Sequence, residues 1–339
     1  MTYNKNKTLY VIQRKELTMK TIKWGVIGTG RIARAFTEAL AGTPDTELYA
    51  VGSRTAEKAV AFAANYGFTK WFGSYEELLS DKDVDVVYVA TTMNSHYENC
   101  MLALEHGKNV LCEKSVTINA QQLRDILALA EKKGLFFMEA MWMKCRPAYI
   151  RMLEWIKSGA IGDIRYIKAD FSNHVRYDAD DRLFRADCGG GALLDECVYP
   201  LTLVYDILGK PDDILAAAHI DKNGIDLSES VILRYKGAYA SVDSGFEVSL
   251  KNNAVIAGDK GSVMLGDWFF VTNNATLYDA EGNIVEECSV SEKINGYEYE
   301  VEEVNRCIRE GLKESPLVPQ SGTLAVMEIM DEISAIIRR

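Results

Sequence analysis

Short apolar runs and amphipathic segments alternate along the first part of the chain. Runs of the kind that form buried strands stand at 22–28, 46–53, 84–91, 109–114 and 135–141, and segments with a helical period lie between them at 31–42, 55–67, 95–107 and 119–134. Strands separated by helices of this length need right-handed crossovers, which place the strands side by side in a parallel sheet. The pattern predicts a doubly wound α/β domain.

The pattern changes after about residue 145. Helical periods at 148–159 and within 189–209 flank a strand pattern at 161–172, and short strand patterns then follow one another at 212–220, 229–236, 238–248, 252–258, 262–266 and 268–273. Two further helical periods stand at 297–312 and 323–339. Consecutive strands joined only by turns predict a second domain of α+β type, with a large, mostly antiparallel sheet that leaves one face open.

Composition narrows the class of protein. The formal net charge of −11 argues against a nucleic-acid partner, since phosphate binding needs a concentrated basic surface. The apolar stretches are short or interrupted by charge, so the sequence predicts no membrane span. Seven scattered cysteines without a C-x-x-C pair indicate reduced thiols and a cytoplasmic location. His96 and Cys100 share a helix face, but no second pair completes a metal site, and we predict none.

A glycine motif follows the first strand pattern. Gly28-Thr29-Gly30-Arg31-Ile32-Ala33 fits G-x-G-x-x-A, in which the first glycine allows a tight turn, the second permits close approach of a pyrophosphate, and the small last residue lets helix and strand pack. The pyrophosphate would lie at the helix N-terminus, where free N–H groups favour an anion. The motif predicts a dinucleotide-binding Rossmann domain whose cofactor contacts include Gly28, Thr29, Gly30, Arg31 and Ile32.

The end of the second strand pattern bears on the choice of cofactor. An NAD-binding unit carries an acid there, but this chain has Ser53 and Arg54, a hydroxyl and a guanidinium suited to a 2′-phosphate. We therefore expect NADP(H) to be preferred, with NAD(H) as the alternative cofactor. The alternative interpretation is that Arg54 is a surface arginine that binds no ligand.

These patterns divide the chain into three parts. Residues 1–18 form a polar N-terminal extension before a second methionine, and whether they belong to the native protein stays open. Residues 19–143 form the Rossmann domain. Residues 144–339 form the α+β domain, to which we assign substrate binding and oligomerisation. Its C-terminal helix could pack back on the Rossmann domain.

A charged pair, Glu113-Lys114, follows the strand pattern at 109–112. The carboxyl end of a strand in an open α/β sheet faces the crevice where ligands bind, so Lys114 is a site candidate. The alternative is a surface ion pair next to the following helix.

With "YGSYEELLSDKDVDVVYVAT", "EHGKNVLCEKSVTINAQQ" and "GGGALLDECVYPL" added to the glycine motif, the chain resembles the Gfo/Idh/MocA oxidoreductase family. The segment 135–165 looks closest to the branch of dimeric dihydrodiol dehydrogenases and NADP-dependent sugar dehydrogenases. The resemblance implies an NAD(P)-dependent dehydrogenase acting on CH–OH groups, with a small polyhydroxylated substrate, and a homodimer or homotetramer.

The resemblance also implies catalytic residues. Lys114 matches the family's Glu-Lys-Pro motif, although Ser115 replaces the proline and puts the backbone rigidity there in doubt. Asp195 and Tyr199 stand four residues apart, as the family's aspartate and its histidine or tyrosine do, and Tyr199 would also contact substrate. A core tyrosine is the alternative for Tyr199. Glu196 departs from the apolar residue common there.

Two further segments carry residues that the resemblance places around the ligands. In "TTMNSHYENC" we expect Thr91, Asn94 and His96 to belong to the cofactor shell, with Glu113 and Lys114 from the neighbouring strand end. In the loop "FSNHVRYDADDRLFR", His174 and Arg176 are candidates for substrate binding, with a solvated surface loop as the alternative.

The function predicted from these parts is reversible hydride transfer between nicotinamide C4 and a carbinol or carbonyl carbon of a sugar, polyol or dihydrodiol. We expect the Lys114 ammonium to stabilise a Tyr199 phenolate, so that the two act as a unit, with Asp195 orienting them. Two alternatives stay open, a redox-assisted glycosidase with tightly bound cofactor and a non-catalytic NADP(H)-binding regulator. The substrate and the reaction direction also stay open.

Overall fold

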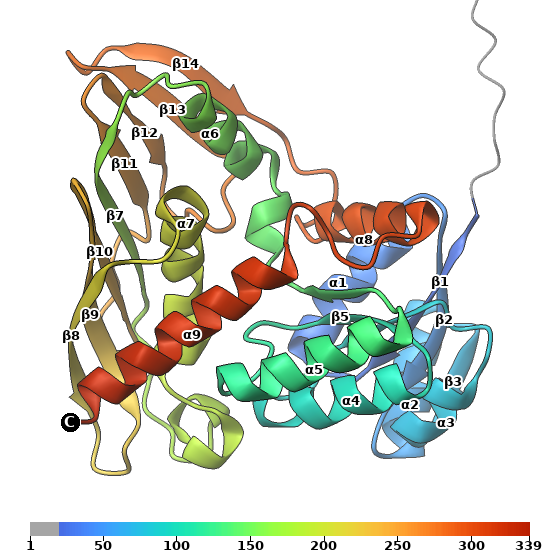
Figure 1. The fold of residues 1–339 in the computed structure, drawn as a ribbon. Helices are drawn as coiled ribbons and strands as arrows, with labels where there is room; N and C mark the ends of the chain where they lie inside the picture. The colour runs from blue at the N-terminus through green and yellow to red at the C-terminus, as the bar shows by residue number, and fades with distance from the viewer. Residues whose placement is uncertain (1–19) are drawn as a thin grey trace, which may run out of the picture.

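A computed structural model describes residues 20–339, so the predicted extension at 1–18 lies outside the described residues. The first half folds as alternating strands and helices around one sheet (Figure 1). Its strands are β1 (Ile22–Ile27), β2 (Thr46–Gly52), β3 (Lys70–Phe72), β4 (Val86–Val89), β5 (Asn109–Cys112) and β6 (Phe137–Glu139). Its helices are α1 (Arg31–Gly42), α2 (Ala56–Tyr66), α3 (Tyr75–Ser80), α4 (His96–Glu105) and α5 (Ala120–Lys133).

The six strands form a parallel sheet in the order β3-β2-β1-β4-β5-β6. The order reverses between β1 and β4, and a crevice opens at the carboxyl ends of the strands at such a switch point. The central strand β4 is buried along its whole length, which explains why its sequence reads as an uninterrupted apolar run. The predicted Rossmann fold is confirmed.

The second half contains an eight-stranded sheet and two helices that pack on it. The strands are β7 (Ile164–Ser172), β8 (Asp213–Ile220), β9 (Asp226–Tyr235), β10 (Ala238–Gly245), β11 (Ala254–Gly258), β12 (Gly261–Leu265), β13 (Asn274–Asp279) and β14 (Ile284–Ser289), in the order β14-β13-β12-β11-β7-β10-β9-β8. Among the described strands of this second sheet, only β7 and β10 pair in parallel. Helices α6 (Pro147–Lys157) and α7 (Val198–Leu208) cover one face. The predicted second fold class is therefore also confirmed.

The other face of this sheet is open and partly apolar. Tyr166 and Tyr239 are register partners on it, with ring centroids 4.8 Å apart, and Leu215 of β8 is more than half exposed. Alternating buried and exposed positions along β8 to β12 give the period of two that made these strands visible in the sequence.

The last two helices tie the halves together. Helix α8 (Glu298–Glu310) packs on α1, and Asn305 accepts a hydrogen bond from the buried Trp24 indole of β1 at 3.0 Å. Helix α9 (Gln320–Ile337) contacts α5 and β6 on one side and α7 and β8 on the other, and it crosses the molecule between them (Figure 1).

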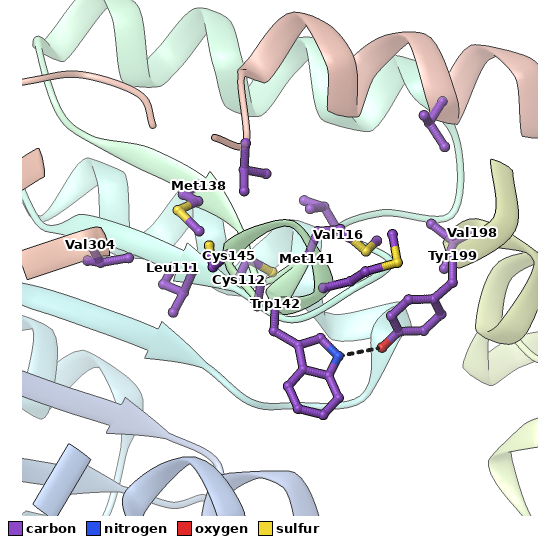
Figure 2. Close-up of a cluster of buried hydrophobic side chains, with 14 of the residues drawn as sticks. Leu111, Cys112, Val116, Met138, Met141, Trp142, Cys145, Val198, Tyr199 and Val304 are labelled. Atoms are coloured by element: carbon purple, nitrogen blue, oxygen red, sulfur yellow. Dashed lines mark hydrogen bonds between the residues drawn. The ribbon is translucent and has the colours of Figure 1, made fainter. Parts of the chain in front are cut away.

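A buried cluster lies where the halves meet (Figure 2). It draws side chains from the end of the parallel sheet, such as Leu111 and Met138, and from α8, such as Val304. Met141 comes from the segment that leads out of β6, and Val198 comes from the start of α7. Because these side chains are buried and closely packed, they hold α7 at a fixed position against the carboxyl end of β5.

One expectation for the second sheet is wrong, and two of its strands were not expected. Residues 268–273 form a turn rather than a strand, because Trp268 has a φ of 61° and its carbonyl accepts from the N–H groups of Val271 and Thr272. The pattern did not indicate β13 and β14. Strand β14 is almost wholly exposed, so its sequence carries no apolar stripe.

A buried ion pair fixes α7 to the connection between the halves, and it generates a stability prediction. The Lys144 ammonium donates to Asp206 of α7 at 2.7 Å, and the Tyr149 hydroxyl donates to the same carboxylate at 2.7 Å. Lys144→Met would leave the Asp206 charge buried without its cation, so the free energy of unfolding should fall by about 3–5 kcal/mol in chemical denaturation.

The matched control is Lys20→Met, which removes the exposed partner of Asp85. That change should cost less than about 1 kcal/mol. Equal losses in the two variants would show that the Lys144–Asp206 pair does not hold α7 in place.

Candidate active site

A cleft of about 1540 Å³ runs along the carboxyl ends of the parallel strands and reaches the second sheet. One half is lined by the glycine motif and by the residues after β2. The other half is lined by Lys114, Asp195 and Tyr199 together with aromatic side chains. The cleft thus brings residues of the first strand and of α7 into one site, although they are far apart in the sequence.

The glycine motif has the geometry that a pyrophosphate requires. Gly28 has a φ of 104°, and a Cβ there would lie 2.5 Å from the Ala90 carbonyl oxygen. A Cβ on Gly30 would meet nothing within 4 Å, so the space above the N-terminus of α1 is open. Ala33 is fully buried where α1 packs on the sheet. These residues fit a dinucleotide, whose phosphates would face the N–H groups of α1.

The same half of the cleft is rich in cations. The cations Arg31, Arg34, Arg54 and Lys58 line it, beside the buried Ser53 and the acid Glu76, and Glu98 of α4 also lines the cleft. The Arg54 guanidinium lies close enough to Tyr75 to oppose the rise in the pKa of that phenol, which burial causes. This excess of positive charge fits a ligand that carries several phosphates.

Lys114 lies at the end of β5 and reaches across to the second half. Its Nζ donates to the Asp195 carbonyl oxygen at 2.6 Å and to Asp195 Oδ1 at 3.3 Å. Arg182 donates to the same Oδ1 from both terminal nitrogens at 3.1 Å. Burial alone would raise the pKa of Asp195, but the two cations hold it below its usual range. Asp195 is therefore a buried carboxylate shared by two cations.

The turn that carries Asp195 is a π-helical segment, η5 (Leu193–Cys197), which runs directly into α7. The Ser115 hydroxyl donates to the Leu194 carbonyl at 2.7 Å, so the backbone after Lys114 is fixed to this turn by a side chain that proline would lack. The Lys114–Ser115 peptide bond is cis.

Tyr199 faces the cleft from the first turn of α7. Its hydroxyl oxygen accepts a hydrogen bond from Trp142 Nε1 at 3.2 Å (Figure 2). Burial raises the pKa of the phenol well above its usual range, and Tyr297 and Glu113 raise it further. The Lys114 ammonium lies 5.2 Å from the centre of the Tyr199 ring, over its face.

The expectation that Lys114 stabilises a Tyr199 phenolate stays a prediction, and the contacts in this structure do not support it. The ammonium donates to Asp195 rather than to the phenol oxygen. The buried Tyr199 is a neutral phenol at ordinary pH.

Glu113 lies beneath Lys114 as a structural support. It accepts from the Tyr88 hydroxyl and from the Lys114 backbone N–H, and burial raises the pKa of its carboxyl. Thr91 also lines the cleft, with its hydroxyl accepting from the Asn99 side-chain amide at 3.1 Å.

Four predicted site residues lie outside the lining of the cleft. Asn94 is exposed and donates to the Asp187 carbonyl at 2.9 Å. His96 is buried between the carbonyl oxygens of Ser115 and Thr91, at 3.0 and 3.1 Å, and burial lowers its pKa to about 4.

His174 and Arg176 are exposed in the loop after β7, and neither lines the cleft in the described structure. His174 Nδ1 lies 2.9 Å from the Glu247 carbonyl. The loop instead brings Arg182 to the site, seven positions before the glycine run that precedes η5. The loop sequence contains four arginine and histidine side chains that could reach a ligand, and no motif distinguishes Arg182 among them.

Glu196 faces neither the cleft nor solvent. It is buried against the second sheet, where Asn173 Nδ2 approaches its Oε1 at 3.4 Å. Burial, with the nearby Asp195 charge, raises the pKa of this carboxyl to about 8, so Glu196 is mostly protonated at neutral pH.

No sequence motif indicated the aromatic residues that line the catalytic half. They are Trp142 from the 3₁₀ helix η2 (Trp142–Cys145), Phe171 from β7, Phe270 from the turn at 268–273, and Tyr297 just before α8. They come from four separate segments, so no local spacing marks them as a set.

Within residues 20–339, no group of His, Cys, Asp and Glu is arranged to hold a metal ion. No helix in the same range is long and apolar enough to cross a membrane.

Known proteins share both the motifs and the fold. Residues 22–141 match the model of the oxidoreductase family with an NAD-binding Rossmann fold, and residues 149–264 match the Gfo/Idh/MocA C-terminal domain. The trans-1,2-dihydrobenzene-1,2-diol dehydrogenase of Xenopus laevis is 35% identical over 321 residues, which cover 91% of this chain and 96% of that protein.

Two solved structures superpose over most of the chain. The 3-ketoreductase KijD10 from Actinomadura kijaniata, in complex with NADP and TDP-benzene, has a TM-score of 0.83 and 26% identity over 94% of this chain and 98% of its own. The aldose-aldose oxidoreductase from Caulobacter crescentus has the same fold, with a TM-score of 0.86 and 22% identity over 94% of this chain and 98% of its own. The resemblance found in the sequence is confirmed, and the chain belongs to the Gfo/Idh/MocA family of NAD(P)-dependent dehydrogenases.

Proposed function

We propose that the protein is an NADP(H)-dependent dehydrogenase that interconverts a ring carbonyl and a secondary alcohol on a small sugar, polyol or dihydrodiol. The observation that carries the proposal is the meeting of Lys114, Asp195 and Tyr199 at one end of the cleft whose other end holds the glycine motif. A dinucleotide that extends from Gly30 toward Lys114 would bring its nicotinamide to these three side chains.

The preference for NADP(H) rests on the charges after β2. Arg54 and Lys58 line the cleft beyond the pyrophosphate region, and the buried Ser53 stands where an NAD-binding unit would have an acid. A 2′-phosphate would gain charged hydrogen bonds from the guanidinium, and a bare ribose hydroxyl would gain less. KijD10, which shares the fold at 26% identity, was solved with NADP.

The chain's own residues polarise the reacting oxygen of the substrate and transfer one proton to it. The neutral Tyr199 phenol donates its proton to the carbonyl oxygen of the substrate as that oxygen gains charge. Lys114 keeps one N–H free after its two contacts with Asp195 and polarises the same oxygen. Bound NADPH supplies the hydride for the carbonyl carbon. Solvent then reprotonates Tyr199, so each turnover consumes one hydride and one proton and yields the secondary alcohol.

The aromatic lining favours a flat or ring-shaped substrate. Phe171 and Phe270 stack with centroids 4.0 Å apart, and Tyr199 packs 4.9 Å from Phe270. Such a wall suits the apolar face of a ring whose hydroxyls point toward Lys114 and Tyr199. The similar dehydrogenases are named for a dihydrobenzene diol, and a cyclic vicinal diol is our first choice of substrate class.

Two other features support an oligomeric assembly and a cellular location for the protein. The open, partly apolar face of the second sheet supports a homodimer or homotetramer that covers it. The seven cysteines are free thiols, five of them buried, which supports a reducing compartment such as the cytoplasm.

The cofactor preference can be measured directly. Arg54→Ala should weaken NADPH binding by about 1.5–3 kcal/mol, because one charged hydrogen bond to the 2′-phosphate is lost, while NADH binding should change little. Fluorescence titration with both cofactors measures the two affinities. Arg124→Ala, which removes a surface ion pair with Glu328, is the control and should alter neither. Equal weakening of NADPH and NADH by Arg54→Ala would contradict the assignment.

The catalytic pair should show non-additive losses. Lys114→Ala and Tyr199→Phe should each lower kcat by roughly 10²–10⁴, since each removes a group that acts on the same oxygen. The double variant should be little worse than either single one. Steady-state kinetics with a panel of cyclic diols and sugars, alongside NADPH titration to check the fold, makes the comparison. Normal turnover in a folded Lys114→Ala protein would leave Lys114 as an ion-pair residue only.

The raised pKa of Tyr199 predicts different pH profiles for the two directions. Reduction needs the protonated phenol, which persists far above neutral pH, so its kcat/KM should have no Tyr199-dependent decline below about pH 10. Oxidation needs the deprotonated form and should rise by about tenfold per pH unit through the alkaline range. Steady-state rates in both directions measure these profiles. A plateau in the oxidation rate near neutral pH would mean that the phenol ionises easily and that Tyr199 is not the neutral donor.

A further inference from the structure

We propose that Trp142 is a positioning residue for the reaction, whose indole N–H directs the Tyr199 proton toward the substrate and holds the phenol oxygen as that proton leaves. The inference rests on the proposed role of Tyr199 as proton donor. It adds a residue that no motif marks, from the connection between the two halves of the molecule.

The contact is directional. Trp142 Nε1 lies 3.2 Å from the Tyr199 hydroxyl oxygen, and the two side chains reach toward each other from η2 and α7 (Figure 2). An indole nitrogen only donates, so the Tyr199 oxygen accepts in this bond. The phenol proton must then turn away from Trp142. Both residues line the cleft, so that direction is open to the oxygen of a bound substrate.

The indole is held firmly in this position. Its ring stacks on Tyr297 with centroids 4.2 Å apart and planes 11° apart, and the Arg146 guanidinium lies 5.0 Å from the ring centre. Arg146 is almost fully buried and pairs with Glu292 at 2.5 Å. The side chain of Trp142 itself is 8% exposed. An indole packed against both a phenol ring and a paired guanidinium has few other rotamers, so its N–H is preorganised.

The charge left on Tyr199 needs a donor of this kind. Burial, Tyr297, Glu113 and Asp195 all oppose a phenolate, and the hydrogen bond from Trp142 is the contact that favours one. Lys114 lies over the ring face and donates to Asp195. A preformed N–H at the phenol oxygen therefore stabilises charge that develops only during proton transfer, which affects kcat more than substrate binding.

The test removes the N–H and keeps the ring. Trp142→Phe should lower kcat for reduction roughly 10- to 100-fold, with KM and NADPH affinity nearly unchanged. The alkaline rise in the oxidation rate should move to higher pH, because the phenolate has lost its donor. In a Tyr199→Phe background, Trp142→Phe should have no further effect on kcat. Replacement of Trp142 by benzothienylalanine, which has the indole shape with sulfur in place of N–H, should reproduce the loss without a packing change.

Trp155→Phe is the matched control. Trp155 is also buried and donates its Nε1 to Glu286 at 3.0 Å, but it lies on α6 outside the cleft. This change should leave kcat and its pH profile as they are.

The outcomes separate the two proposals. Normal kcat in the benzothienylalanine protein, with Tyr199→Phe inactive, would overturn the role of Trp142 and leave that of Tyr199 intact. The same would follow if Trp142→Phe lowered kcat equally with and without the Tyr199 hydroxyl, since the loss would then come from packing. Normal turnover in Tyr199→Phe would overturn the proposed function itself.

Discussion

The contact between Lys114 and Asp195 is the interaction on which the site depends. It joins the carboxyl end of β5 to the π-helical turn before α7, and so connects a strand of the first sheet with a helix of the second. A buried ion pair of this kind costs desolvation, and here Arg182 adds a second cation to the same oxygen. The arrangement leaves one net positive charge at the site. That charge can act on a substrate oxygen only because the buried cluster where the halves meet holds the end of β5 and the start of α7 in fixed positions.

Burial raises the pKa values of two acid groups near the cleft. Glu113 and Glu196 both have raised pKa values, and burial is the main cause for each. Glu196, whose pKa is raised to about 8, is mostly protonated at neutral pH and does not compete with Asp195 for Lys114 and Arg182. The electrostatics of the site therefore depend on which carboxylate Lys114 and Arg182 contact. Within the described residues, only Asp195 forms an ion pair with both of them.

The sequence revealed those parts of the molecule whose physics is local. The parallel sheet was predictable because strands buried on both faces leave uninterrupted apolar runs, and the glycine motif because a tight turn beside a phosphate needs φ values and space that only glycine allows. Lys114 was predicted from its place at the end of a strand pattern, and Asp195 and Tyr199 were predicted from family motifs. Trp142 and Arg182 were missed because their neighbours at the site are distant in sequence. The charge state of Tyr199 could not be predicted from the sequence, because it depends on burial and on where the Lys114 ammonium points, which no pattern encodes.

Helix α9 has a consequence for how the protein is made. It packs on β6 and α5 of the first sheet and on β8 and α7 of the second, yet it follows every other described element along the chain. During synthesis, both sheets emerge from the ribosome before the helix that covers part of each. The apolar surface along β6 and β8 therefore stays exposed to water until α9 has been synthesised. During this interval the nascent chain is most prone to aggregation or chaperone binding.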